Sequence, residues 1–141
     1  MKMGSNPINL LLRFLLELAA LFSYGCWGWN AGDRWFRYLL MILAPLVGAM
    51  VWGTFAVPND PSRSGKAPVP VPGWLRLILE LTIFGFACLA LAVSGLGVFA
   101  WILGVLVLFH YGFSVDRIHW LLAMNENNDP SITNKNKLKY K

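Results

Sequence analysis

The chain has 141 residues, of which 57% are hydrophobic and only 13% are charged, and its formal net charge is +5. Soluble domains carry about 25% charged residues, so this composition argues against a soluble globular domain. It favours one compact unit that is embedded in a membrane, so we expect the lipid bilayer to be a partner of the protein. Basic residues beside apolar helices are typical of topology signals and lipid contacts, so the charge does not indicate nucleic-acid binding.

The first apolar segment runs over residues 8–29 and contains the stretch LRFLLEL, with Arg13 and Glu17 four positions apart. A spanning helix needs about 20 apolar residues. The two charges interrupt the apolar run, and no clear small-residue cleavage site follows it. We therefore expect a retained spanning helix and not a secretory signal.

The second apolar segment covers residues 36–57 and follows the short link NAGDRW. A link of this length predicts an antiparallel hairpin with the first segment. Pro45 lies inside the segment, where we expect it to kink the helix. Ala44 and Gly48 are small residues spaced by four, a pattern that lets helices approach closely, either within the protein or between copies of it.

The link between the second and third segments, PNDPSRSGKAPVPVPG at 58–73, contains five prolines. Proline blocks helix and favours an extended backbone, so one interpretation is a semi-rigid spacer between two hairpins. The other interpretation uses Arg63 and Lys66, which are candidates for contact with an anionic lipid headgroup or a partner protein. The stretch lacks the pattern of a P-loop.

Two further apolar segments, 74–93 and 98–115, are joined by the short link SGLG and predict a second hairpin. The membrane domain then ends near residue 122. The tail at 123–141 is polar and rich in lysine, and beyond a short helical extension we expect it to be disordered.

The distribution of Lys and Arg predicts the orientation of the chain in a bacterial cytoplasmic (inner) membrane. Lys2, the loop cations, Arg117 and the tail lysines gather on one side, whereas Arg34 and Arg37 lie on the other. Because cytoplasmic segments carry the excess of Lys and Arg, we place both termini and the Pro-rich loop in the cytoplasm.

The stretch LRLILEL at 75–81 repeats LRFLLEL of the first segment in the same register. A weaker echo pairs WGTFAV at 52–57 with YGFSV at 111–115. These echoes predict an all-α, four-transmembrane-helix bundle built from two tandem helical hairpins, as a parallel 2+2 pseudo-repeat. Chance similarity between Leu-rich helices is the competing explanation.

The repeated charges predict an intramembrane polar cluster of Arg13, Glu17, Arg76, Glu80 and His110. A rise of 1.5 Å per residue puts the two glutamates and His110 at roughly 10–14 Å from the cytoplasmic end of their helices. An unpaired charge at such depth is costly, so the glutamates should face inward, while the arginines are shallow enough to reach the headgroups. The cluster either sets helix packing or forms a proton-linked or ligand-binding site. Further along, Tyr111, Asp116, Arg117 and Trp120 are expected to form an interfacial rim.

Three stretches together resemble the YrdB-like family of small bacterial integral membrane proteins, a domain of unknown function: NPINLLLRFLLELAAL, FAVPNDPSRSGKAPVPVPGWLRLILEL and HYGFSVDRIHWLL. The resemblance covers roughly residues 6–122, and VPNDPSRSGKAPVPVPG is its most specific part. It implies a four-span membrane protein and brings no catalytic residues, cofactor or substrate.

The sequence contains no motif of a metalloprotease or serine hydrolase and no metal-ligand spacing, so we expect no catalytic residues, no metal and no cofactor. We expect a non-enzymatic accessory or interaction subunit, which assembles as a homodimer or within a larger membrane complex. The alternative is a small proton- or cation-coupled transporter that uses Glu17 and Glu80. An intramembrane enzyme acting on lipid or quinone has the least support.

Overall fold

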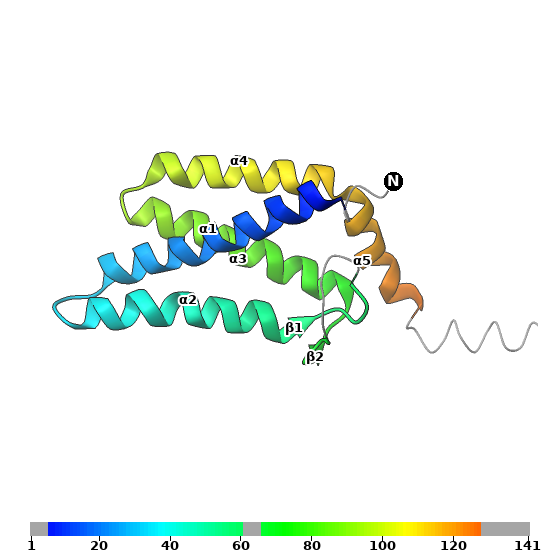
Figure 1. Ribbon diagram of the computed structural model, residues 1–141, viewed down its shortest axis with the longest axis horizontal. Helices are drawn as coiled ribbons and strands as arrows, with labels where there is room; N and C mark the ends of the chain where they lie inside the picture. Colours follow the sequence, from blue (N-terminus) through cyan, green and yellow to red (C-terminus); the bar gives the residue numbers. More distant parts are fainter. Residues whose placement is uncertain (1–5, 61–65, 128–141) are drawn as a thin grey trace, which may run out of the picture.

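The computed structural model describes residues 6–60 and 66–127 of the chain, with side chains to residue 123 (Figure 1). The described part is all-α apart from one pair of two-residue strands. In chain order the elements are α1 (Pro7–Ala31), α2 (Phe36–Thr54), β1 (Phe55–Ala56), β2 (Val69–Pro70), α3 (Gly73–Val93), α4 (Gly97–Phe113) and α5 (Val115–Asn127).

Helices α1, α2 and α3 are each long and apolar enough to cross a membrane. Helix α4, with 17 residues, passes the same test only together with α5, and the two are bent by 67° at the break between them. The described residues therefore hold three helices of spanning character, or four if the bent pair is one span. The chain leaves the α4 axis at Ser114, just before the end of the segment predicted at 98–115.

Local sequence explains where the helices begin and turn. The Asn6 side chain accepts a hydrogen bond from the Ile8 amide, and Pro7 occupies the first helical position, so α1 starts on a standard cap. Pro45 lies inside α2, and the helix continues on both sides of it. Gly95 has φ +78° in the turn between α3 and α4, a conformation that favours glycine.

The hydrophobic core lies between α1, α3 and α4 and receives no buried residue from α2. Its members are mostly small or branched side chains around one phenylalanine: Leu16, Ala20, Phe84, Ala87, Leu91, Leu103 and Val107. The link between α1 and α2 and the link between α3 and α4 lie at one end of the molecule, while α5 and the strand pair lie at the other (Figure 1). The functional residues discussed below gather at the α5 end.

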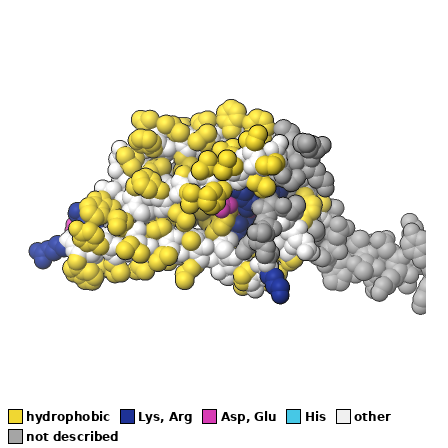
Figure 2. Space-filling model, viewed as in Figure 1, with side chains coloured by type: hydrophobic (Ala, Val, Ile, Leu, Met, Phe, Trp, Pro, Cys, Tyr) yellow, Lys and Arg dark blue, Asp and Glu magenta, His cyan; other side chains and the backbone are white. Residues whose placement is uncertain are grey.

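Helix α2 packs along α1 and contributes no residue to the buried set. A Cβ on Gly28 would come within 2.4 Å of the Leu40 carbonyl oxygen, so a glycine at this position is what permits the close approach of the two helices. On the face drawn in Figure 2, hydrophobic side chains are prominent along the length of the helices, and charged side chains are visible only in small gaps and toward the ends. A helix that is apolar on all sides and not buried by protein is typical of a membrane environment.

The Pro-rich loop is more than a spacer, because both of its described ends are held against the helices. β1 and β2 pair in parallel, with Phe55 opposite Val69, and the Val71 amide donates to the Ala56 carbonyl at 2.9 Å. Asp60 is buried beside the strands. Lys66 is exposed, whereas Arg63 lies outside the described residues.

The predicted tail begins inside α5, which continues to Asn127. The first five residues of the segment predicted at 123–141 are therefore helical, as a short extension. The remainder of that segment lies outside the described residues.

Candidate functional site: a buried network centred on Glu80

Glu80 is the centre of an ion-pair network at the α5 end of the helices. Its side chain is 1% exposed, and its two carboxylate oxygens accept five hydrogen bonds. The donors are Arg13 Nη2, Arg76 Nε, Tyr111 Oη and both terminal nitrogens of Arg117, all at 2.9–3.1 Å. Charge-assisted hydrogen bonds of this kind are the strong ones in proteins. The network therefore joins α1, α3, α4 and α5 at one carboxylate.

The expectation that Arg13 and Arg76 reach outward to the headgroups is wrong. Both side chains are buried and turn inward to Glu80. Arg76 also donates through Nη1 to the Trp52 carbonyl at 2.9 Å and to the Phe55 carbonyl, and its guanidinium lies 4.4 Å from the Trp52 ring centre. The interior thus supplies acids, carbonyls and an aromatic face, and these partners replace the water that a snorkelling arginine would seek.

Arg117 is a member of the network that the sequence analysis assigned to the interfacial rim, and that assignment is wrong. Its side chain is buried, and its Nη2 donates to Glu80 Oε1 at 2.9 Å and to Asp60 Oδ2 at 2.8 Å. The bend after α4 turns α5 back over the start of α3, which carries Arg117 inward. Tyr111, also assigned to the rim, donates to Glu80 instead.

The face of α5 that carries Arg117 is recognisable in the structure and not in the sequence, because two of its three buried residues are polar. Ser114, Arg117 and Leu121 are all buried and follow the 3–4 spacing of one helix face. That face marks the inner side of α5. No comparable spacing points to Asp60, which reaches Arg117 from the loop.

His110 is buried but belongs to a separate chain of hydrogen bonds. Asn9 Oδ1 accepts from His110 Nδ1 at 2.9 Å, and Asn9 Nδ2 donates to Ser114 Oγ at 2.7 Å. This chain ties the start of α1 to the end of α4. The structure thus brings four of the five predicted cluster residues into one network, Glu17 through Arg13, and joins the fifth, His110, to Asn9.

Glu17 is the least enclosed acid of the network. Its Oε1 accepts from Arg13 Nε at 3.1 Å, and its side chain keeps 26% of its exposure. The two members of the LRxxLEL repeat are therefore unequal in the structure: the second glutamate is the buried centre, and the first is a peripheral partner.

Among the residues that the structure describes, the formal charges of the network balance. Three guanidinium groups (Arg13, Arg76 and Arg117) face three carboxylates (Glu17, Glu80 and Asp60), which gives +3 − 3 = 0. Breaking a buried ion pair costs about 3–5 kcal/mol because the remaining charge is left uncompensated. Within the described residues, no three His, Cys, Asp or Glu side chains are arranged to hold a metal ion. The arrangement is suited to fixing helices and loop in one register.

The fold and the network define a class: a small helical protein whose helices are long and apolar enough to cross a membrane and whose buried charges are paired with one another. A family model described as "Protein of unknown function (DUF2568)" matches residues 11–108, and the chain belongs to that family.

The family assignment is supported by one close relative. The chain is 45% identical over 117 residues to "Uncharacterized protein YrdB" of Bacillus subtilis (strain 168), an alignment that covers 83% of this chain and 95% of the relative. The resemblance to a YrdB-like domain of unknown function is thereby confirmed. No solved structure gives a significant match.

Proposed function

We propose that this protein is a non-enzymatic accessory or interaction subunit of the bacterial cytoplasmic (inner) membrane. The observation that carries the proposal is the Glu80 network. Each of its arginines is hydrogen-bonded to acids or carbonyls of the same chain. Charges engaged in this way stabilise the fold and leave the apolar helix faces and the loop as the surfaces available to other molecules.

The four-span arrangement proposed here is a pair of tandem hairpins, α1–α2 and α3–α4, with both termini and the Pro-rich loop in the cytoplasm. Two features support the pseudo-repeat. Trp52 and Tyr111, which occupy corresponding places in its weaker echo, both pack edge-on against Phe84. They also both contact the network, Trp52 through the Arg76 guanidinium and Tyr111 through Glu80.

The Pro-rich loop is the proposed contact for a partner protein or anionic lipid. Lys66 is exposed, and the segment that contains it lies between two anchored ends, Asp60 and Val71. Anchored ends reduce the entropy that a loop loses on binding. Arg63 and Lys66 supply positive charge for the contact.

The test is quantitative crosslinking and co-purification of the tagged full chain from native membranes. Replacing both Arg63 and Lys66 with Glu should reduce the recovery of the partner at least fivefold, whereas replacing Arg34 with Glu at the opposite link should leave it unchanged. Equal recovery from all three proteins would contradict the role of the loop.

The geometry gives little support to the transporter alternative. A carboxylate that binds and releases protons needs a weakly held ionised state, but Glu80 accepts hydrogen bonds from three arginines and a tyrosine. Proton-coupled flux in liposomes that is lost on Glu80→Gln would contradict the accessory-subunit proposal and favour the transporter.

A further inference from the structure

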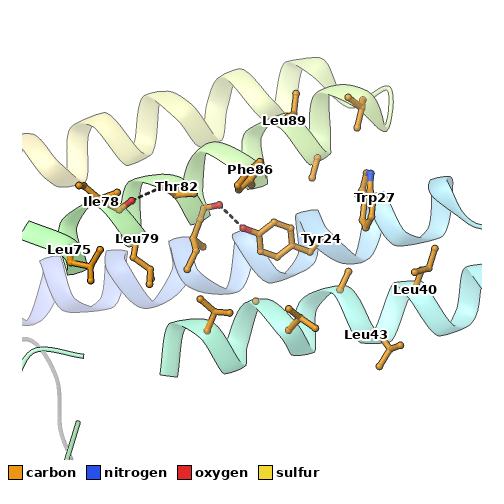
Figure 3. Close-up of a pocket in the computed structure, with 17 residues that line it drawn as sticks. Tyr24, Trp27, Leu40, Leu43, Leu75, Ile78, Leu79, Thr82, Phe86 and Leu89 are labelled. Carbon is orange, nitrogen blue, oxygen red and sulfur yellow. Dashed lines mark hydrogen bonds between the residues drawn. The ribbon is translucent and has the colours of Figure 1, made fainter. Parts of the chain in front are cut away.

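An apolar groove runs along one face of the molecule between α2 and α3, with α1 as its floor (Figure 3). Its volume is about 870 Å³. Leu43 and Val47 form part of the α2 wall, Ile78 and Phe86 part of the α3 wall, and Tyr24 rises from the floor. Helices α2 and α3 make few contacts with each other, so the groove is a feature of the helix arrangement rather than of a single side chain.

The two side-chain hydroxyls of the groove are already bonded within the protein. Tyr24 donates its hydroxyl to the Ile83 carbonyl at 2.6 Å, and Thr82 donates to the Ile78 carbonyl at 2.8 Å (Figure 3). The walls therefore offer almost purely apolar contact, which suits an occupant that is apolar along most of its length.

The length of the groove distinguishes between apolar occupants. Its α3 wall extends from Leu75 to Val93, which is roughly 27 Å at 1.5 Å per residue. The hydrocarbon core of a bilayer is about 30 Å thick, so an acyl chain from one leaflet would line only about half of this wall. A helix that crosses the bilayer would line all of it.

A small niche opens beside the groove and contains Glu17, the partly exposed carboxylate among the described members of the network. The niche has a volume of about 100 Å³ and includes Glu17, and Gly48 and Ile83 line both niche and groove. From the described side chains Glu17 accepts a single hydrogen bond, at Oε1 from Arg13. A donor on the occupant would find a charged acceptor here, at a depth where water is scarce.

A second copy of the chain matches this niche poorly. Among the described residues, the exposed mid-span positions of α1 and α2 are aliphatic, phenylalanine or methionine, and none of them offers a hydrogen-bond donor. On α4 the donor at such a position is the Trp101 indole, which is too large for the niche, and the Thr82 hydroxyl of α3 is engaged in the groove itself. A different protein is therefore the better complement.

We propose that the groove receives one transmembrane helix of a different protein, apolar along its length except for a small hydrogen-bond donor (Ser, Thr, Asn or Lys) that reaches Glu17. This inference rests on the proposed function and assigns the membrane-embedded part of the interaction. Small and polar residues at helix interfaces are the usual means of association in lipid, which gives the pairing a known physical basis.

The experiment places a photoreactive benzoyl-phenylalanine in the groove at Val47 of the full chain, in native membranes. Leu106, an exposed residue of α4 outside the groove, is the control position. We expect a protein adduct from position 47 at least fivefold above that from position 106. Mass spectrometry should map the adduct to a spanning segment of another protein with Ser, Thr, Asn or Lys at the level of Glu17.

Two variants test the parts of the site. Glu17→Leu should lower the adduct at least fivefold, provided that the purified variant keeps a cooperative thermal transition. If that variant does not fold, Val51→Trp fills the groove from the α2 wall, and Met50→Trp, on the exposed neighbouring position, is its matched control. Val51→Trp should lower the adduct yield, and Met50→Trp should not.

The inference would be overturned if the adducts contain only lipid or a second copy of the chain. It would also be overturned if positions 47 and 106 give equal yields, or if the folded groove variants leave the yield unchanged. Capture of a partner through the Arg63 and Lys66 loop without a groove adduct would overturn the inference and leave the proposed function standing. If neither the loop nor the groove captures a partner protein, both the proposed function and this inference are wrong.

Discussion

At the scale of single residues, the protein shows how a glutamate can be buried in an apolar helix. Glu80 is not protected by one partner but by four, and these come from different helices. The sequence neighbour Arg76 supplies only one of the five hydrogen bonds. An Arg–Glu pair at i, i+4 contributes a few tenths of a kcal/mol on an isolated helix, so the burial depends on the tertiary partners.

Tyr111→Phe isolates the contribution of one neutral partner to this carboxylate. Removing the hydroxyl deletes the 2.9 Å hydrogen bond to Glu80 Oε2 and should lower the free energy of unfolding by about 1.5–3 kcal/mol, the range for hydrogen bonds to charged groups. Unfolding by SDS titration in mixed micelles measures the change. Tyr38→Phe, at an exposed tyrosine on α2, is the control and should change stability by less than about 0.5 kcal/mol.

The same residues mark the reach of prediction from sequence. Arg13, Glu17, Arg76 and Glu80 were identifiable because charges are rare in spanning helices, and a repeated rare event is visible without a structure. The direction of the arginines was not predictable, since it depends on acceptors such as the Trp52 carbonyl that a linear pattern does not reveal. Asp60 resembled an ordinary loop residue for the same reason.

At the scale of elements, the decisive feature is the turn of α5 across the start of α3. A Cβ on Gly73 would lie 1.7 Å from the Leu121 carbonyl oxygen. The backbone of α5 therefore occupies the space that a side chain at position 73 of α3 would need. Hydropathy describes only how apolar a segment is: it placed the end of the fourth apolar segment at residue 115 but does not indicate the direction that the chain takes after it. The 67° bend depends on contacts with α3 and was therefore not predicted.

Gly73→Ala should displace α5 from α3. We expect a loss of about 1–3 kcal/mol in the free energy of unfolding, typical of overpacking, together with faster amide hydrogen exchange throughout α5. Gly85→Ala is the matched control, because nothing lies within 4 Å of its added Cβ and alanine is the better helix former. If both substitutions leave α5 exchange unchanged, the docking of α5 described above is incorrect.

The loop offers a second test at this scale. Asp60→Asn replaces the ion pair with Arg117 by a neutral contact, which should loosen the strand pair beside it. Amide exchange at Val71, whose N–H is bonded to the Ala56 carbonyl, should become about tenfold faster. Lys66→Gln, at an exposed position of the same loop, should not change it. Identical exchange rates in the two variants would show that the ion pair does not hold the loop.

At the scale of the whole molecule, the protein has two unlike ends. One end consists of the short links, and the other gathers α5, the strand pair and the ion-pair network (Figure 1). The network holds α1, α3, α4 and α5 together at the end that the proposed orientation places in the cytoplasm. In the proposed membrane arrangement, the α2–α3 groove lies along the apolar length between these ends and is open to the bilayer.

The proposed orientation predicts opposite labelling of the two ends. In a protein with Cys26 and Cys88 replaced by Ala, a new cysteine at Lys66 should react with a membrane-impermeant maleimide only in inside-out vesicles. A cysteine at Asp33, in the link between α1 and α2, should react in intact cells or spheroplasts. Both positions are exposed. Labelling of both from one side would contradict the spanning arrangement itself, and exchanged labelling would contradict only its direction.

The central claim is that the buried charges serve to hold the fold, with Glu80 as their centre. The most direct measurement is the free energy of unfolding of Glu80→Gln in the full chain, compared with Glu17→Gln. Within the described part of the network, Glu80→Gln leaves three arginines facing two carboxylates, and the variant should lose about 3–5 kcal/mol. Glu17 is about one quarter exposed and bonded to one arginine, so Glu17→Gln should lose less than about 1 kcal/mol. A Glu80→Gln protein as stable as the wild type, or no more affected than Glu17→Gln, would contradict the claim.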